Sequence, residues 1–122
     1  MTEKPMNFGT GFVTTEYLQP MKIYGSKGKE LTEQWAGSAE SYLGISVAGF
    51  PNYFLLLGPN TGLGHNSVVF MIEAQIEYVI KALSYLQESK KTFVDVKLER
   101  QETFCRSTQT KLQKFSWGSG CD

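Results

Sequence analysis

Apolar side chains recur at every third or fourth position over residues 67–89, and this spacing predicts a long amphipathic helix. The apolar stripe consists of Val69, Ile72, Ile76, Val79, Leu83 and Leu86. Asn66 or Ser67 suits the N-cap position, and Glu77 with Lys81 forms a favourable pair one turn apart. Because helices in proteins owe most of their stability to the packing of such a face, the stripe predicts a partner layer.

Two further helices are predicted from the same spacing. Residues 100–115 place four side chains in line, namely Phe104, Thr108, Leu112 and Phe115. Residues 29–36 are long enough for two turns, in which Leu31 lies next to Trp35. Both tryptophans of the chain, Trp35 and Trp117, are expected to be core or interface residues.

Three short segments fit strands better than helices. Residues 42–47 read YLGISV and residues 53–57 read YFLLL, with a turn containing Pro51 between them. The second run has no polar alternation, so both of its faces are expected to be buried. Residues 92–98 alternate as in a half-exposed strand, with one face made of Val94, Val96 and Leu98.

These elements predict an α+β fold in a single domain over residues 1–122, with few short strands packed on one long helix and a second, C-terminal helix. Residues 1–8 are polar and follow no pattern, so the start of the chain is expected to be disordered. The chain has 122 residues, of which 41% are hydrophobic and 13% aromatic, and this content suits one packed core.

Charge and cysteine content narrow the classes of function. Lys and Arg total 12 and Asp and Glu total 12, so no long-range field favours nucleic acid. The longest strictly apolar run, residues 68–72, is far shorter than the roughly 20 residues that span a membrane, and the start has no signal-peptide core. One histidine and two separated cysteines predict no metal site. Cys105 and Cys121 are expected to be free thiols in the cytoplasm, with a disulfide between them as the alternative.

The most informative segment is residues 58–67, GPNTGLGHNS, which joins the apolar run 53–57 to the long helix. A strand, a glycine-rich turn and a helix N-terminus in this order aim backbone N–H groups at an electronegative ligand. Taken alone, the local pattern favours a simple capping turn. His65 has no acid or cysteine paired with it in the sequence, so no proton transfer is assigned to it.

A wider set of motifs places this segment in context. Along the chain they are GTGF at residues 9–12, YGSKGKELTEQW at 24–35, SYLGISVAGFPN at 41–52, GPNTGLGHNS at 58–67, IEAQ at 72–75 and WGSGC at 117–121. In this order and at these spacings, the sequence resembles the C-terminal part of FAD- and NADPH-dependent monooxygenases of the Baeyer–Villiger and flavin-containing type. The resemblance covers nearly the whole chain and implies a fragment of their α/β FAD-binding fold.

The resemblance also implies that the glycine-rich loop and the following helix N-terminus face FAD. The cofactor-binding residues that it implies are Gly58, Pro59, Asn60, Thr61, Gly62, Leu63, Gly64, His65, Asn66 and Ser67, together with Thr10 and Gly11 of the GTGF turn. In the full enzyme, NADPH and O2 would support the oxygenation of a ketone or of a soft heteroatom such as sulfur. No catalytic residue is implied within this chain.

Departures from the family pattern limit what the chain is expected to do alone. Both dinucleotide-binding glycine motifs are absent, since the turn at residues 9–12 lacks the third glycine and a preceding apolar strand. A helix terminus contributes about 0.3–2 kcal/mol toward a charged group, whereas micromolar binding needs about 8 kcal/mol. We therefore expect the chain alone neither to hold FAD tightly nor to turn over NADPH, which leaves open whether it is an enzyme by itself.

The expected partner is the remainder of the FAD and NADPH domains, or a second copy of the chain in a homodimer. The alternative function is a non-enzymatic interaction or oligomerisation module derived from such an enzyme, which would use an exposed apolar flank. Neither the substrate nor the type of oxygenation follows from the motifs.

Overall fold

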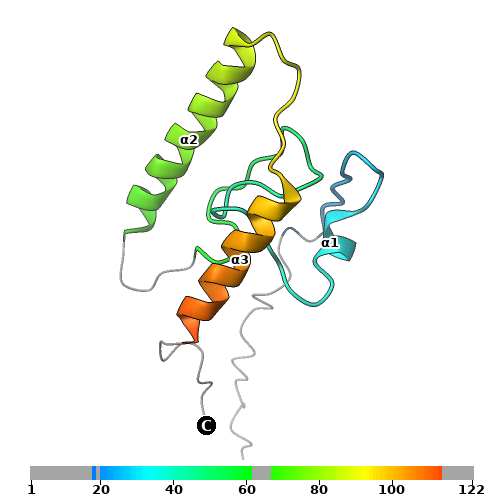
Figure 1. The fold of residues 1–122 in the computed structure, drawn as a ribbon, viewed down its shortest axis with the longest axis vertical. Coiled ribbons are helices and arrows are strands. Elements are labelled where there is room, and N and C mark those ends of the chain that lie inside the picture. Colours follow the sequence, from blue (N-terminus) through cyan, green and yellow to red (C-terminus); the bar gives the residue numbers. More distant parts are fainter. Residues whose placement is uncertain (1–17, 19, 62–66, 114–122) are drawn as a thin grey trace, which may run out of the picture.

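The computed structural model describes residue 18, residues 20–61 and residues 67–113, and these residues contain three helices. They are α1 over Leu31–Gln34, α2 over Val68–Glu88 and α3 over Leu98–Leu112 (Figure 1). The predicted long helix and the predicted C-terminal helix are thus confirmed, with small shifts of their bounds. The helix predicted over residues 29–36 is shorter than expected. Phe115, Trp117 and Cys121 lie outside the described ranges, and so do residues 1–8, for which disorder was predicted.

The predicted strands are wrong for the part of the chain that the structure describes, which holds two isolated bridges and no strand. Residues 42–47 close a tight turn instead, in which Leu43 and Gly44 have φ angles of 58° and 70°. Residues 53–57 end in a similar bend, because Leu57 has a φ of 55°. Left-handed residues turn the chain out of the extended conformation that a strand ladder needs.

The segment between α2 and α3 is paired mainly with side chains rather than with a strand. Asn52 donates its N–H to the Val94 carbonyl at 3.0 Å, and its Oδ1 accepts from the Val94 N–H at 3.0 Å. Its Nδ2 donates to the Thr92 carbonyl at 3.1 Å. Both carboxylate oxygens of Asp95 accept from the Gly49 N–H at 3.2 Å. The predicted alternation is therefore present in the sequence, but two side chains take the place of a neighbouring strand.

α2 begins as predicted, because the Oγ of Ser67 accepts a hydrogen bond from the Phe70 N–H at 3.4 Å. Its buried face, however, is rotated away from the predicted stripe. Half of the stripe is half-buried, namely Ile72, Val79 and Leu86, whereas the other half is exposed, namely Val69, Ile76 and Leu83. The one buried residue of α2 is Gln75. The face of α2 that turns inward is therefore the one that carries the side-chain amide of Gln75.

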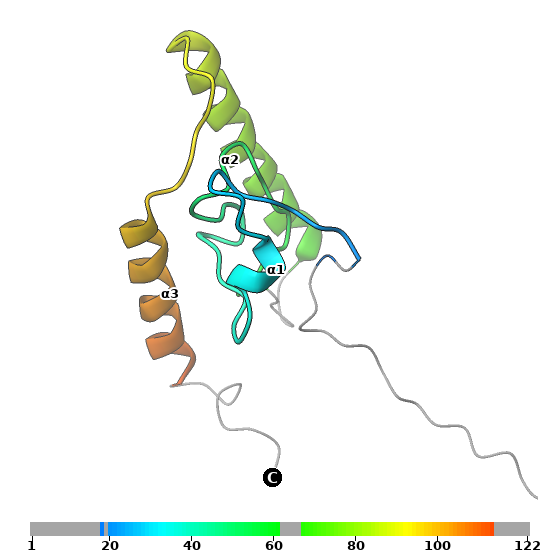
Figure 2. The same cartoon turned by 90° about the vertical axis from the view of Figure 1, so that its right-hand side faces the viewer.

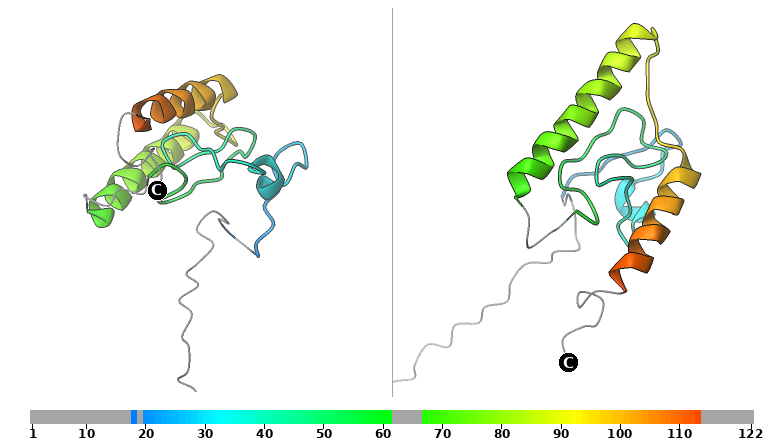
Figure 3. Two further views of the ribbon diagram at one scale, coloured as in Figure 1. Left: turned by 90° about the horizontal axis from the view of Figure 1, so that it is seen from below. Right: turned by 60° about the vertical axis from the view of Figure 1, so that its left-hand side comes forward.

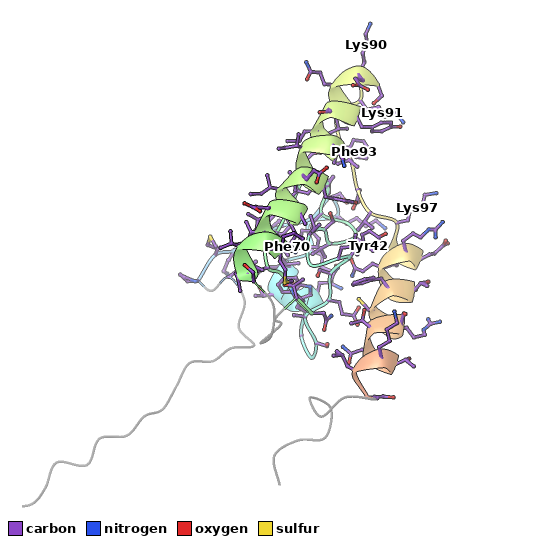
Figure 4. All side chains as sticks on the ribbon, turned by 90° about the vertical axis from the view of Figure 1, so that its left-hand side faces the viewer. Tyr42, Phe70, Lys90, Lys91, Phe93 and Lys97 are labelled. Carbon is purple, nitrogen blue, oxygen red and sulfur yellow. The ribbon has the colours of Figure 1, made fainter. Side chains whose placement is uncertain are left out.

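α3 starts at Leu98, where the sequence predicted the end of a strand. It contacts the middle of the molecule through Gln101, whose Oε1 accepts from the Ala48 N–H at 2.7 Å. Phe104 packs edge-on against Tyr42, with the ring centroids 5.5 Å apart. Figure 4 shows Tyr42 between the two long helices, on the side of α3. The buried amide of Gln101 and this aromatic pair both hold α3 against the coil around residues 42–48.

The hydrophobic core lies between α1 and a coil layer, which we define as residues 39–57. Its buried members are Leu31, Trp35, Val47, Phe50 and Leu55. The core role predicted for Trp35 is therefore confirmed, and its indole N–H donates to the Glu40 carbonyl at 2.8 Å. α2 and α3 lie on two sides of the coil layer, and the C-terminal end of α2 projects beyond it (Figures 2 and 3). Within the described ranges, no helix is both long and apolar enough to cross a membrane.

Candidate functional site

The entry loop, residues 58–67, leads from the coil layer into α2 (Figure 1). Of the residues that the resemblance implies at the cofactor, the structure describes Gly58, Pro59, Asn60, Thr61 and Ser67. The others lie outside the described residues, namely Gly62, Leu63, Gly64, His65, Asn66, Thr10 and Gly11. The structure therefore describes the two ends of the entry loop, where it leaves the coil layer and where it caps α2.

Hydrogen bonds hold the first residues of the entry loop. The Gly58 N–H donates to the Gly44 carbonyl at 3.0 Å, and the Ser41 Oγ donates to the Pro59 carbonyl at 3.2 Å. The Thr61 Oγ1 donates to the Gly58 carbonyl at 2.6 Å. Gly58 and Pro59 are both buried, so this end of the loop is built into the interior rather than displayed on the surface.

Gln75 ties α2 to the same place. Its Oε1 accepts from the Leu57 N–H at 2.9 Å, and its Nε2 donates to the Leu43 carbonyl at 3.4 Å. Its side chain is 6% exposed, and a buried amide of this kind is expected to have both of its polar ends paired. The bridging position of Gln75 was not predicted, although its place among apolar neighbours on a predicted helix was a signal for it.

Gly44 and Gly58 let the coil layer and the entry loop approach each other closely. A Cβ atom on Gly58 would lie 2.6 Å from the Gly44 carbonyl oxygen, which is too close for any other residue. A Cβ atom on Gly44 would collide with the methyl group of Thr61. Gly44 also has a φ of 70°, which side-chain-bearing residues rarely adopt.

α3 contacts the start of the entry loop and the neighbouring coil layer through two side chains. The Gln109 Nε2 donates to the Asn60 Oδ1 at 3.4 Å, and the buried Cys105 thiol donates to the Ser41 carbonyl at 3.5 Å. Burial raises the pKa of the Cys105 thiol, so the group remains a protonated donor at neutral pH. Asn60 itself is exposed, with a φ of 66°. These contacts join residues 49 and 64 positions apart, and no local pattern predicted them.

The start of α2 is exposed. Val68, Val69 and Phe70 all have exposed side chains, and Figure 4 shows Phe70 at this end of the helix. A helix N-terminus carries a partial positive charge and favours an anionic or electron-rich group. The entry loop contains no Asp or Glu, so it has no carboxylate that would neutralise that charge. An exposed helix N-terminus without a carboxylate beside it suits an electron-rich group.

Two cavities in the described structure lie elsewhere. One of about 280 Å³ has Tyr42, Tyr53 and Tyr78 in its lining, and one of about 910 Å³ includes Trp35 and Gln101. No described residue of the entry loop lines either cavity. Burial raises the pKa of Tyr53 and of Tyr78, and the neighbouring Tyr42 raises that of Tyr78 further. The described residues hold no cluster of His, Cys, Asp and Glu that suits a metal ion.

Several known proteins are similar in sequence to this chain. No family model matches it. The Baeyer-Villiger monooxygenase of Pseudomonas aeruginosa is 42% identical over 113 residues, which are 93% of this chain and 21% of that enzyme. The FAD-binding monooxygenase ktnD of Aspergillus niger is 36% identical over 105 residues, which are 86% of this chain and 17% of that enzyme.

A solved structure agrees with these relatives. The cyclohexanone monooxygenase of Rhodococcus sp. Phi1, bound to NADP+, matches with a TM-score of 0.77 and 25% identity, over 84% of this chain and 19% of that one. The chain is homologous to a segment of the Baeyer–Villiger and FAD-binding monooxygenases. The monooxygenase resemblance drawn from the motifs is thereby confirmed. This monooxygenase homologue spans about a fifth of the length of the relatives that it matches.

Proposed function

We propose that this chain is the FAD-facing segment of a flavin-dependent monooxygenase. The observation that supports the proposal most strongly is the match of 93% of the chain, at 42% identity, to a Baeyer-Villiger monooxygenase. Because the chain spans only 21% of that enzyme, the proposed activity is one of a larger polypeptide or assembly. In the chain alone, we expect FAD to bind weakly or not at all.

Within this proposal, the entry loop and the start of α2 face the flavin. The residues that would face it are Asn60, Thr61, Gly62, Leu63, Gly64, His65, Asn66 and Ser67, with Thr10 and Gly11 from the earlier turn. Gly58 and Pro59 are buried and would support this loop from the interior. When bound, FAD supplies the redox and oxygen chemistry. The chain itself offers backbone N–H groups and the positive end of α2 to the electron density of the ring. Gln75 and Ser41 keep the loop in register with the helix.

The reaction proposed for the whole enzyme is the oxygenation of a ketone or of a soft heteroatom, with NADPH and O2 as co-substrates. No acid–base role falls to the described residues of the entry loop, because glycine, proline, asparagine, threonine and serine side chains do not titrate near neutral pH. Their contribution is to orient the cofactor and to stabilise charge on it.

A second function is favoured by a separate observation. Several apolar side chains of α2 are exposed, as expected for a non-enzymatic interaction or oligomerisation module. The two functions differ in one property, because such a module binds protein and needs no flavin.

Flavin binding by a hybrid enzyme tests the proposal. The hybrid is the Pseudomonas aeruginosa monooxygenase in which this chain replaces the matched 113 residues. We expect the hybrid to purify with bound FAD, seen as flavin absorbance, and the chain alone to remain colourless after FAD titration and gel filtration. A folded hybrid without FAD would contradict the proposed function.

Asn60→Asp in the hybrid probes the placement of the loop. The substitution keeps the size of the side chain and the oxygen that accepts from Gln109, but it adds a negative charge beside the proposed ring position. Reduced flavin gathers negative charge, so we expect its midpoint potential to fall by tens of millivolts, a shift on the order of 1–3 kcal/mol. Gln87→Glu, the same change from amide to carboxylate at an exposed position near the far end of α2, is the control and leaves the potential unchanged.

A further inference from the structure

α2 carries a line of apolar side chains that stays exposed. This apolar strip consists of Val69, Ile76, Ile80 and Leu83, which are 64%, 42%, 56% and 49% exposed. With 3.6 residues per turn, these four positions lie within an arc of about 60°, so they form one continuous line along the helix. The strip runs beside the inward face that contains Gln75.

We propose that the apolar strip is the contact surface for the dinucleotide-binding part of the monooxygenase. The inference rests on the proposed function and adds the partner and the face that it binds. The sequence of this chain lacks both dinucleotide-binding glycine motifs, and the chain spans about a fifth of its relatives. The partner is therefore a large domain that holds the rest of the cofactor.

The position of the strip supports this partner. Val69, its first member, lies two residues after Ser67, where the entry loop ends and α2 is capped. A domain that holds FAD against the entry loop thus meets the start of the strip at the same place. The strip then continues along α2 to Leu83, and the same domain would cover it over this length.

The size of the strip argues against a second copy of the chain as its main occupant. Four aliphatic side chains that are about half exposed offer at most a few hundred Å², whereas a stable interface buries roughly 800 Å² on each side. The strip therefore suits a part of a larger contact better than a whole dimer interface.

Charge argues against a membrane surface. α2 contains the acidic residues Glu73, Glu77 and Glu88 and one basic residue, Lys81, so its net charge is 1 − 3 = −2. Helices that lie on anionic membranes carry Lys and Arg on their polar face instead. A protein partner with an apolar groove matches this helix better.

The experiment compares the same substitutions in the isolated chain and in the hybrid enzyme described above. Ile76→Glu combined with Ile80→Glu places two charges in the strip. We expect this pair to lower the Tm of the hybrid by about 5 °C or more, and that of the isolated chain by less than about 2 °C. The contrast arises because the strip is exposed in the chain and covered in the hybrid. Ala74→Glu with Ser84→Glu, at exposed positions off the strip, is the matched control and shifts neither Tm by more than about 2 °C.

The other possible results of this experiment distinguish the contact surface from the proposed function. An equal response of the hybrid and the chain to the strip substitutions would overturn the proposal without touching flavin binding. A stable dimer of the isolated chain that Ile80→Glu converts to a monomer would show a second copy as the occupant. A parent hybrid that does not fold also counts against the proposal, because the strip then fails to fit a monooxygenase. A hybrid that responds as expected but holds no FAD would leave the contact surface standing and contradict the proposed function.

Discussion

At the scale of the residue, Gly44 allows the coil layer and the entry loop to lie close together. Gly44→Ala would place a methyl group against the methyl of Thr61 at a φ of 70°. Gly28 has a similar φ of 73° but open space around it, so Gly28→Ala reports the effect of the backbone angle alone. We expect the free energy of unfolding to fall by about 1 kcal/mol for Gly28→Ala and by about 2–4 kcal/mol for Gly44→Ala. Urea unfolding of the purified chain measures both.

Thr61→Ser separates the collision from other effects. It removes the methyl group but keeps the hydroxyl that donates to the Gly58 carbonyl. Combined with Gly44→Ala, it should therefore recover most of the difference between the two glycine variants. Equal losses at Gly28 and Gly44, with no recovery in the double variant, would show that the two segments are not in close contact.

At the scale of the element, the attachment of α2 depends on Gln75. Gln75→Leu keeps the helix propensity but leaves the Leu57 N–H and the Leu43 carbonyl without their side-chain partner. We expect a loss of about 1–3 kcal/mol in the free energy of unfolding, measured by urea titration with circular dichroism. Gln87→Leu, at an exposed position of the same helix, is the control and should change stability by less than about 0.5 kcal/mol. Similar values for both variants would mean that the buried amide does not anchor the helix.

The elements also show why prediction succeeded for helices and failed for strands. α2 starts where the sequence placed it, because the Ser67 cap and the helical spacing are local properties. A strand instead needs a neighbouring strand to pair with. Residues 92–98 form hydrogen bonds with the side chain of Asn52 rather than with such a strand. The face of α2 was half correct for a related reason, since the spacing locates apolar residues but not the polar Gln75 that pairs with the coil layer.

At the scale of the whole molecule, the tyrosine-lined cavity lies between the coil layer, α2 and the segment that joins α2 to α3. The pKa of Tyr53 and that of Tyr78 are raised in the folded chain, chiefly by burial. Unfolded tyrosine ionises near pH 10, so the unfolded state loses these protons first. The stabilisation is therefore fully present below about pH 10 and is lost as the pH rises through the folded pKa values.

Thermal unfolding at a series of alkaline pH values checks this expectation. The Tm should fall as the pH rises above about 10, together with the appearance of tyrosinate absorbance. Tyr78→Phe removes one ionising group while keeping the ring, so its Tm should fall less steeply over the same range. An unchanged slope in this variant would contradict a role for Tyr78 in the alkaline transition.

Some features of the fold and of the candidate site depend on short stretches of sequence, and others depend on contacts between residues far apart in the chain. By itself, the sequence determined the two long helices, the cap of α2 and the kinship with monooxygenases, because these depend on spacing and motifs within short stretches of chain. Only the tertiary structure decided which face of α2 turns inward and how the entry loop is anchored. Those features depend on contacts that Gln75, Gln109 and Cys105 make with residues 18, 49 and 64 positions away, and such pairs come together only when the chain folds.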